Sequence, residues 1–258
     1  SLSLALLWGQ VCMAESPKVN GQAAKPISLS KSPNESSKST KKEKFKKIFN
    51  GKDLKGWERF GGAHNFEVKK GMVIGTTQYG PVNGFMTTKK KYRDFDLRFE
   101  VKCDVELNSG VQIRSYSRTP RGYLIGPQVE IEERDAGFVW GEHLGGWISK
   151  DRSGEEKQKA FKAGKWNRYR ILAVGPRIQT WINGVQIADV LSPENDKAGR
   201  IGLQVHQINN NKDFEGAQVR WRNIRLKNIK RPKFTILSKG KNLKDFQSEG
   251  NWQLEKNG

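Results

Sequence analysis

The stretch Phe95-Asp96-Leu97-Arg98-Phe99-Glu100-Val101-Lys102-Cys103 alternates five apolar residues with four charged ones. Successive side chains of a β-strand point to opposite faces, so this pattern predicts a strand with one buried and one solvated face. Further runs of period two occur at Met72–Thr76, Gly110–Tyr116, Gln128–Glu132, Asn167–Val174, Gln179–Ile182, Gly199–Val205 and Gln218–Leu226. The sequence therefore predicts a domain built mostly from strands.

The connections between these runs favour antiparallel pairing. Asn183-Gly184 separates Gln179–Ile182 from Val185–Ala188, and this dipeptide is a strong signal for a two-residue hairpin because both residues tolerate positive φ. The one helical candidate is the short, charged segment Glu155–Lys162. Many strands without a β-α-β rhythm predict an all-β sandwich of two antiparallel sheets.

The charge of the chain is concentrated in part of its length. The 258 residues carry a formal net charge of +20, which by itself would suggest a polyanionic partner. Residues 15–47 contain nine Lys against three Glu and few large apolar residues, a composition typical of a disordered linker. Because much of the excess lies in this segment, we expect no specific nucleic-acid partner.

The first fourteen residues read as the remnant of a secretory signal peptide. Leu2, Leu4, Leu6, Leu7 and Trp8 form a short apolar run, and Val11-Cys12-Met13-Ala14 precedes polar sequence. The run is too short to span a bilayer, so we expect an exported protein, periplasmic or extracellular in a bacterium. Removal of Cys12 with the signal would leave Cys103 without a disulfide partner. No other segment is predicted to cross a membrane.

The start of the predicted domain has an echo near the end of the chain. Phe49-Asn50-Gly51-Lys52-Asp53-Leu54-Lys55-Gly56-Trp57 is similar to Ser238-Lys239-Gly240-Lys241-Asn242-Leu243-Lys244-Asp245-Phe246. A repeat at this spacing suggests tandem domains. We therefore expect one domain over residues 48–230, followed in residues 231–258 by a linker and the truncated start of a second copy.

Seven motifs in this order resemble the 3-keto-disaccharide hydrolase family. They are Phe49-Asn50-Gly51-Lys52-Asp53-Leu54-Lys55-Gly56-Trp57, Tyr92-Arg93-Asp94-Phe95-Asp96-Leu97, Asn108-Ser109-Gly110-Val111-Gln112-Ile113-Arg114, Gly164-Lys165-Trp166-Asn167, Asn183-Gly184, Gly199-Arg200-Ile201-Gly202-Leu203-Gln204-Val205-His206 and Arg222-Asn223-Ile224. The resemblance implies a concanavalin-A-like jelly roll and the hydrolysis of glycosides whose sugar is oxidised at C3. The family usually carries a Glu-x-Gln-x-x-Asp arrangement. Here Gln128 matches it, whereas the nearby acidic residues match only in kind.

Strand alternation predicts which side chains face the sugar. If Val129 and Ile131 point into the core, Gln128, Glu130 and Glu132 share the opposite face. The same reasoning places Gln112 with Arg114 on one strand and Gln204 with His206 on another. Such a face can be merely solvated. Gln, Glu, Arg and His, however, form hydrogen bonds to hydroxyl groups or move protons, which favours a site.

The residues of this face suit elimination from a 3-keto-glycoside. The ketone acidifies the C2 hydrogen, so the reaction needs a base, a stabiliser for the enolate oxygen and an acid for the leaving group. We assign the base to Glu130 or His206, the stabiliser to Arg114 and the acid to Glu132. Glu130 and Glu132 would also suit a hydrolase with two carboxylates.

The remaining site predictions concern sugar binding. We expect the substrate to contact Gln112, Gln128, Gln204, Glu142, His143, Trp147 and Tyr123, the last four from irregular stretches beside the Glu130 strand. Asn108 and Trp166 are predicted to be structural, as a turn residue and a core ring respectively. The spacing of the three His supports no metal site and no cofactor. The partner is a carbohydrate in either of two functions, a hydrolase or a non-catalytic carbohydrate-binding module.

Overall fold

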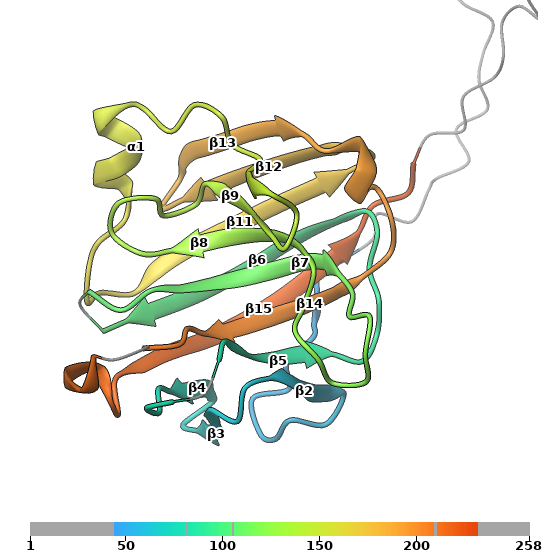
Figure 1. Cartoon of the computed structure of the whole chain (residues 1–258). Helices are drawn as coiled ribbons and strands as arrows, with labels where there is room; N and C mark the ends of the chain where they lie inside the picture. Colours follow the sequence, from blue (N-terminus) through green and yellow to red (C-terminus); the bar gives the residue numbers. More distant parts are fainter. Residues whose placement is uncertain (1–43, 81, 105, 209–210, 232–258) are drawn as a thin grey trace, which may run out of the picture. The chain divides into compact units, whose positions relative to one another are not determined.

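The computed structural model describes residues 44–80, 82–104, 106–208 and 211–231. They form two antiparallel sheets that pack face to face, so the predicted all-β sandwich of the concanavalin-A-like jelly-roll class is confirmed (Figure 1). Three of the predicted strands, at Met72–Thr76, Phe95–Cys103 and Asn167–Val174, have the expected bounds.

The first sheet contains β6 at its centre. Its order is β13-β12-β11-β6-β15-β4-β3, with the short strand β1 also paired to β15. The strands are β1 Lys46–Lys47, β3 Asn65–Lys69, β4 Met72–Thr76, β6 Phe95–Cys103, β11 Asn167–Val174, β12 Arg177–Ile182, β13 Val185–Leu191 and β15 Gln218–Asn228.

The second sheet lies in front of the first in Figure 1 and carries the polar residues of interest. Its order is β10-β9-β8-β7-β14-β5-β2. The strands are β2 Trp57–Gly61, β5 Gly84–Thr88, β7 Ser109–Ser115, β8 Gly126–Ile131, β9 Val139–Glu142, β10 Gly146–Trp147 and β14 Arg200–Val205.

The helical content of the described residues is small. The predicted helix is present as α1, Glu155–Ala160, and two single turns of 3₁₀ helix follow, η1 at Pro193–Asn195 and η2 at Lys212–Phe214. No helix among the described residues is long and apolar enough to cross a membrane.

The core lies between the two sheets and is built from the alternate residues that the sequence pattern identified. Leu97 and Val101 of β6 are fully buried, as are Val111 of β7 and Val129 and Ile131 of β8, and all belong to one apolar cluster. Because these side chains fill the space between the sheets, the intervening residues of β8 lie on the outer face of the second sheet.

The hairpin predicted at Asn183-Gly184 is present between β12 and β13. Both residues have positive φ, 51° and 99°, as this type of tight turn requires. Asn183 also donates from Nδ2 to the carbonyl of Ala160 at 2.8 Å, which ties α1 to the turn.

The expected boundary between linker and domain needs one correction. Lys46 and Lys47, which we predicted to lie in the linker, form β1 and pair with Leu226 and Arg225 of β15. The signal-peptide remnant, the linker up to residue 43 and the second copy in residues 232–258 lie outside the described residues and stay predictions.

Candidate functional site

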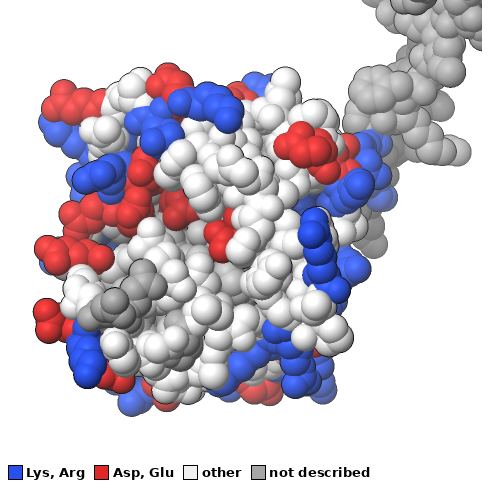
Figure 2. Space-filling view, in the orientation of Figure 1, with Lys and Arg blue, Asp and Glu red and all other residues white. Residues whose placement is uncertain are grey.

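A cavity of about 340 Å³ opens on the outer face of the second sheet. It is lined by ten residues from the strands and the loops above them: Asn83, Asn108, Gln128, Glu130, Glu132, Trp140, Glu142, Trp147, Gln204 and His206. In the space-filling view, acidic side chains reach the middle of this otherwise largely uncharged face (Figure 2). Seven of the eleven predicted site residues, Trp147 among them, therefore line one cavity.

The floor of the cavity is a relay of side-chain amides. Gln112 Nε2 donates to Gln128 Oε1 at 3.2 Å. Gln128 Nε2 in turn donates to Glu130 Oε1 at 2.9 Å and to Gln204 Oε1 at 3.3 Å. Gln112 does not line the cavity itself, but it fixes the Gln128 amide, whose N–H groups then hold the other two side chains.

Glu130 is the most perturbed acid of this site. Burial raises the pKa of its carboxyl to about 8, and the negative charges of Glu132 and Glu142 add to the shift, against the hydrogen bond from Gln128. At neutral pH Glu130 is therefore mostly protonated. Its Oε1 accepts from Gln128, so its proton is best carried on Oε2, which has no hydrogen bond to the described residues.

Two buried polar atoms at the cavity have no hydrogen-bond partner among the described residues. They are Gln204 Nε2, a donor, and Asn108 Oδ1, an acceptor. Asn108 uses only its Nδ2, which donates to Glu132 Oε2 at 3.4 Å. Buried polar groups are nearly always paired in folded proteins, and an unpaired donor and an unpaired acceptor on two residues that line one cavity are groups that a hydroxylated ligand would satisfy.

His206 contributes a nitrogen whose protonation is set by the backbone. Its Nδ1 lies 2.6 Å from the Gln207 carbonyl, and a carbonyl only accepts, so Nδ1 carries the hydrogen. The remaining Nε2 of a neutral ring is then a lone-pair acceptor without a partner among the described residues. Burial lowers the pKa of His206, which keeps the ring neutral at physiological pH.

Glu132 also lines the cavity, at the point where β8 has ended. Burial raises the pKa of its carboxyl, and Asp135 adds to the shift, against the hydrogen bond from Asn108. The cavity thus holds two carboxyl groups whose environments disfavour ionisation.

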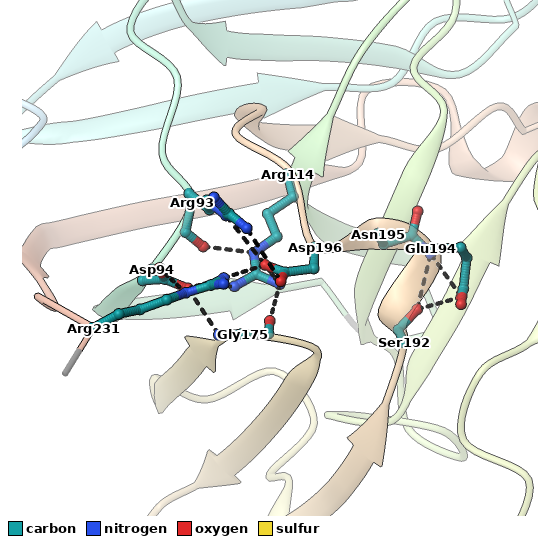
Figure 3. Close-up of polar contacts among 9 residues, drawn as sticks. All are labelled: Arg93, Asp94, Arg114, Gly175, Ser192, Glu194, Asn195, Asp196 and Arg231. Carbon is teal, nitrogen blue, oxygen red and sulfur yellow. Dashed lines mark hydrogen bonds and ion pairs between the residues drawn. The ribbon is translucent and has the colours of Figure 1, made fainter. Parts of the chain in front are cut away.

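Arg114 does not face this cavity, and its predicted role as enolate stabiliser is wrong for this reason. Its fully buried guanidinium donates to the Arg93 carbonyl at 2.6 Å, the Gly175 carbonyl at 2.7 Å and Asp94 Oδ1 at 3.2 Å (Figure 3). These partners lie before β6 and in the β11–β12 turn. The hydrogen bonds of the Arg114 side chain to these partners connect the second sheet to the first.

A β-bulge explains why alternation failed at Arg114. Ser115 of β7 pairs with Arg200 of β14, and the next pair is Gln112 with Gly202. Between these two pairs β7 advances by three residues and β14 by only two. The additional residue is accommodated at Arg114, which has a φ of 51°, and a bulge of this kind turns the following side chain to a different direction.

The loop residues predicted to bind sugar divide into two groups. Glu142 and Trp147 line the cavity, where Trp140 donates from Nε1 to Glu142 Oε2 at 3.1 Å and packs edge-on against Trp147. Tyr123 and His143 do not line it. Their rings lie 4.2 Å apart and about half of each side chain is exposed.

Three residues outside the predicted site also line the cavity. Asn108, predicted to be structural, and Trp140 and Asn83 complete the wall. Asn83 donates to Glu142 Oε1 at 3.4 Å and accepts from the Gln207 backbone N–H at 2.9 Å. Asn83 lies outside every alternating run, so only its contacts identify it. Trp166, predicted in the core, is half-buried with Arg222 over its ring.

The described residues contain no cluster of three or more His, Cys, Asp or Glu side chains arranged to hold a metal ion. Cys103, the free cysteine among them, is buried in the core and donates to the Leu107 carbonyl.

Comparison with known proteins supports the fold and the family. Two crystal structures from Parabacteroides distasonis, both described provisionally as glycosyl hydrolases, share 18% and 20% identity with this chain, each with a TM-score of 0.52. Each alignment covers 72% of this chain, and 94% and 100% of the respective structures. A Bacillus subtilis protein with a galectin-like fold is 9% identical, with a TM-score of 0.52 over 72% of this chain and 94% of its own.

These structural similarities show the fold, and no curated protein matches the chain. The family is shown by the sequence itself, because residues 44–227, most of the chain, match the sequence model of the family described as the 3-keto-alpha-glucoside-1,2-lyase-like domain. The protein belongs to the 3-keto-alpha-glucoside-1,2-lyase-like family.

Proposed function

We propose that this domain cleaves 3-keto-glycosides by elimination across C1 and C2, followed by addition of water. The observation that carries the proposal is the juxtaposition of a protonated carboxyl, Glu130, a neutral imidazole, His206, and an unpartnered amide donor, Gln204, around one cavity. The family to which the chain belongs is described by the same bond cleavage.

The protonation states favour one division of roles between the two predicted bases. A general base must be unprotonated and a general acid protonated at the working pH. His206 meets the first requirement through Nε2, and Glu130 meets the second through its raised pKa. His206 is therefore our base and Glu130 our acid, with Glu132 as the neighbouring carboxyl that helps to keep Glu130 protonated.

The elimination step balances with these two groups. His206 Nε2 takes the proton from C2, the C2–H electrons form the C1=C2 bond through the enolate of the C3 ketone, and the C1–O bond breaks. The departing oxygen takes the proton of Glu130. Water then adds its hydroxyl to C1 and gives its other proton to Glu130, while His206 returns its proton to C2. These transfers give the free 3-keto sugar, a net hydrolysis and the starting protonation states of both residues.

Gln204 replaces Arg114 as our candidate for stabilising the enolate. Its Nε2 has two hydrogens and no partner among the described residues, and its Oε1 is held by Gln128, so the amide cannot turn over without losing that bond. A fixed donor aimed at a developing oxyanion lowers the barrier because it needs no reorganisation.

A non-catalytic carbohydrate-binding module is the second function to be tested. The edge-on pair of Trp140 and Trp147 in the cavity wall favours it, since aromatic rings bind the apolar face of a sugar. A pair of carboxyl and imidazole groups with shifted pKa values is not needed for binding alone, which is why we place the hydrolase first.

The deciding experiment compares 3-keto-glucosides with the corresponding ordinary glucosides and measures the released aglycone. We expect release only from the 3-keto substrates, because without the ketone the C2 hydrogen is not acidic. Deuterium at C2 should slow the release if His206 removes that hydrogen in the limiting step. Binding of both sugars without release would favour the module, and equal cleavage of both would favour a hydrolase with two carboxylates.

A further inference from the structure

The outer face of the first sheet, on the other side of the sandwich from the cavity, carries a row of arginines. Arg170 of β11 pairs directly with Arg98 of β6, and Arg98 pairs directly with Arg225 of β15. Lys47 of β1 pairs with Arg225 and extends the row. Like charges directly opposite one another on neighbouring strands destabilise a sheet, so this row needs a physical explanation.

The three arginines of the row lie in a hollow of about 410 Å³. Arg98, Arg168, Arg170 and Arg225 line it, with Glu100 as its acidic member. Two irregular strand positions border the hollow, Trp181 at a register shift in β12 and Asn223, with a φ of 54°, at a register shift in β15. Bulges re-aim side chains and occur frequently beside binding sites.

Only part of the positive charge is compensated by the protein. Asp96 accepts from both Arg98 and Arg170, and Glu100 accepts from Arg222 and Asn223. Arg168 and Arg225 line the hollow, are exposed, and form no direct ion pair with the described residues, although the charge of Arg225 is near enough to help lower the pKa of Glu100. Two guanidinium groups are therefore available to an outside anion.

The paired guanidinium groups are also held in place by aromatic rings. Arg170 lies over the Trp181 ring at 4.4 Å and Arg98 over the Phe45 ring at 4.5 Å. Ordering these two long side chains in the free protein lowers the entropy cost that a ligand would otherwise meet. The hollow thus combines two fixed and two free guanidinium groups.

We propose that this hollow, the arginine hollow, binds an acidic polysaccharide through its carboxylate or sulfate groups. The planar guanidinium fork matches such groups with two parallel hydrogen bonds. Because the arginine hollow and the cavity lie on opposite faces of the sandwich, one chain can hold a polysaccharide while its cavity processes a sugar. The proposal extends beyond the proposed function and does not require it.

Other polyanions fit the arginine hollow less well. None of the exposed large apolar side chains of the described residues lines it, so there is nothing to insert into a lipid bilayer. Among the described residues, the indole rings of Trp166 and Trp181 on this face each stack on a guanidinium, whereas binding of single-stranded nucleic acid relies on rings open to the bases.

The test is the affinity of the full chain for polygalacturonate and dextran sulfate, measured at fixed ionic strength by gel electrophoresis through the immobilised polysaccharide. The double variant Arg168→Gln/Arg225→Gln removes the two unpaired guanidinium groups and leaves the Asp96 and Glu100 ion pairs intact. We expect its dissociation constant to rise at least about tenfold, on the scale of two lost charge-assisted hydrogen bonds.

The matched control is Lys89→Gln/Lys91→Gln, which removes the same charge from exposed positions beside Tyr92. We expect this variant to stay within about twofold of the wild type, and neutral dextran to retain none of the proteins. Equal loss in both double variants would mean attraction by net charge alone and would overturn the site. Loss of binding to single-stranded DNA or to phosphatidylserine vesicles, with unchanged binding to both polysaccharides, would overturn the assigned ligand.

Discussion

Arg114 Nη2 lies 3.2 Å from Asp94 Oδ1 in an ion pair whose Arg114 side chain is fully buried, although Gln112, two residues earlier on the same strand, points to the amide relay. Asp94 also accepts from the Gly175 N–H at 2.8 Å and from Arg231 Nε at 2.6 Å. These salt bridges and hydrogen bonds lower the pKa of Asp94, against its burial. Arg114 therefore joins the strand that supports the site to the opposite sheet.

We predict that Arg114→Gln lowers the free energy of unfolding by about 2–4 kcal/mol, because it leaves the buried carbonyls of Arg93 and Gly175 without their donor, whereas Asp94 keeps Arg231 and the Gly175 N–H. Urea denaturation measures this loss. Arg93→Gln is the matched control. It removes a half-exposed side chain from the same cluster, with Asp196 as partner, and should cost less than about 1 kcal/mol. A fully stable Arg114→Gln with reduced turnover would return Arg114 to the catalytic site.

The buried Glu130 makes stability depend on pH. Its pKa is about 8 in the folded protein and near 4.5 when unfolded, so the folded state holds a proton that the unfolded state releases between these values. The stabilisation is complete below about pH 4.5 and is lost as the pH rises through about 8.

We predict that the free energy of unfolding of Glu130→Gln, relative to that of the wild type, increases as the pH rises. The increase is at most about 5 kcal/mol, which corresponds to a pKa of about 8 in the folded protein against 4.5 when unfolded. The change is measured by determining the unfolding free energy of both proteins at about pH 5 and at about pH 9. His64 and His206, whose pKa values are lowered by burial, act with the opposite sign in both proteins and cancel in the difference. A difference that is constant with pH would place the Glu130 pKa near its ordinary value.

Gly110 leaves the space that Gln128 occupies. It pairs with Glu130 across β7 and β8, and a Cβ at this position would lie 2.6 Å from both Cγ and Cδ of Gln128. We predict that Gly110→Ala displaces the Gln128 amide and raises the KM for a 3-keto-glucoside at least about tenfold, since the amide no longer orients Glu130 and Gln204.

The double variant Gly110→Ala/Gln128→Ala separates crowding from orientation. Removing the long side chain relieves the contact, so thermal denaturation should show recovery of the stability lost in Gly110→Ala. The KM should stay high, because the amide is still absent. Recovery of both stability and KM would show that Gln128 has no part in binding.

The site was predictable where strands are regular and not elsewhere. Val129 and Ile131 alternate with Gln128 and Glu130 as expected, because β8 is regular and one face is buried in the core. At Arg114 the bulge reverses the expected direction, and a period-two pattern carries no signal for an additional residue in one strand. Asn83 approaches the site only because β5 pairs with β14, a contact between residues far apart in sequence.

The pH dependence of turnover distinguishes the base from the acid. With His206 as base and Glu130 as acid, kcat/KM should rise through the lowered pKa of His206 and fall above about pH 8, where Glu130 loses its proton. His206→Gln should abolish the rising limb along with most of the activity. A rise, and not a fall, through about pH 8 would make Glu130 the base.

Glu130→Gln should lower turnover on a 3-keto-glucoside with an alkyl aglycone by at least about 10²-fold, the usual scale for a general acid or base. The Gln amide keeps the shape of the carboxyl but has no proton to transfer, and Gln128, Gln204 and Asn108 remain to bind the sugar. A nitrophenolate leaves without protonation, so the same variant should lose far less activity on a nitrophenyl 3-keto-glucoside. An equal loss on both substrates would mean that Glu130 acts before the C1–O bond breaks, as a base at C2, and that His206 supports it.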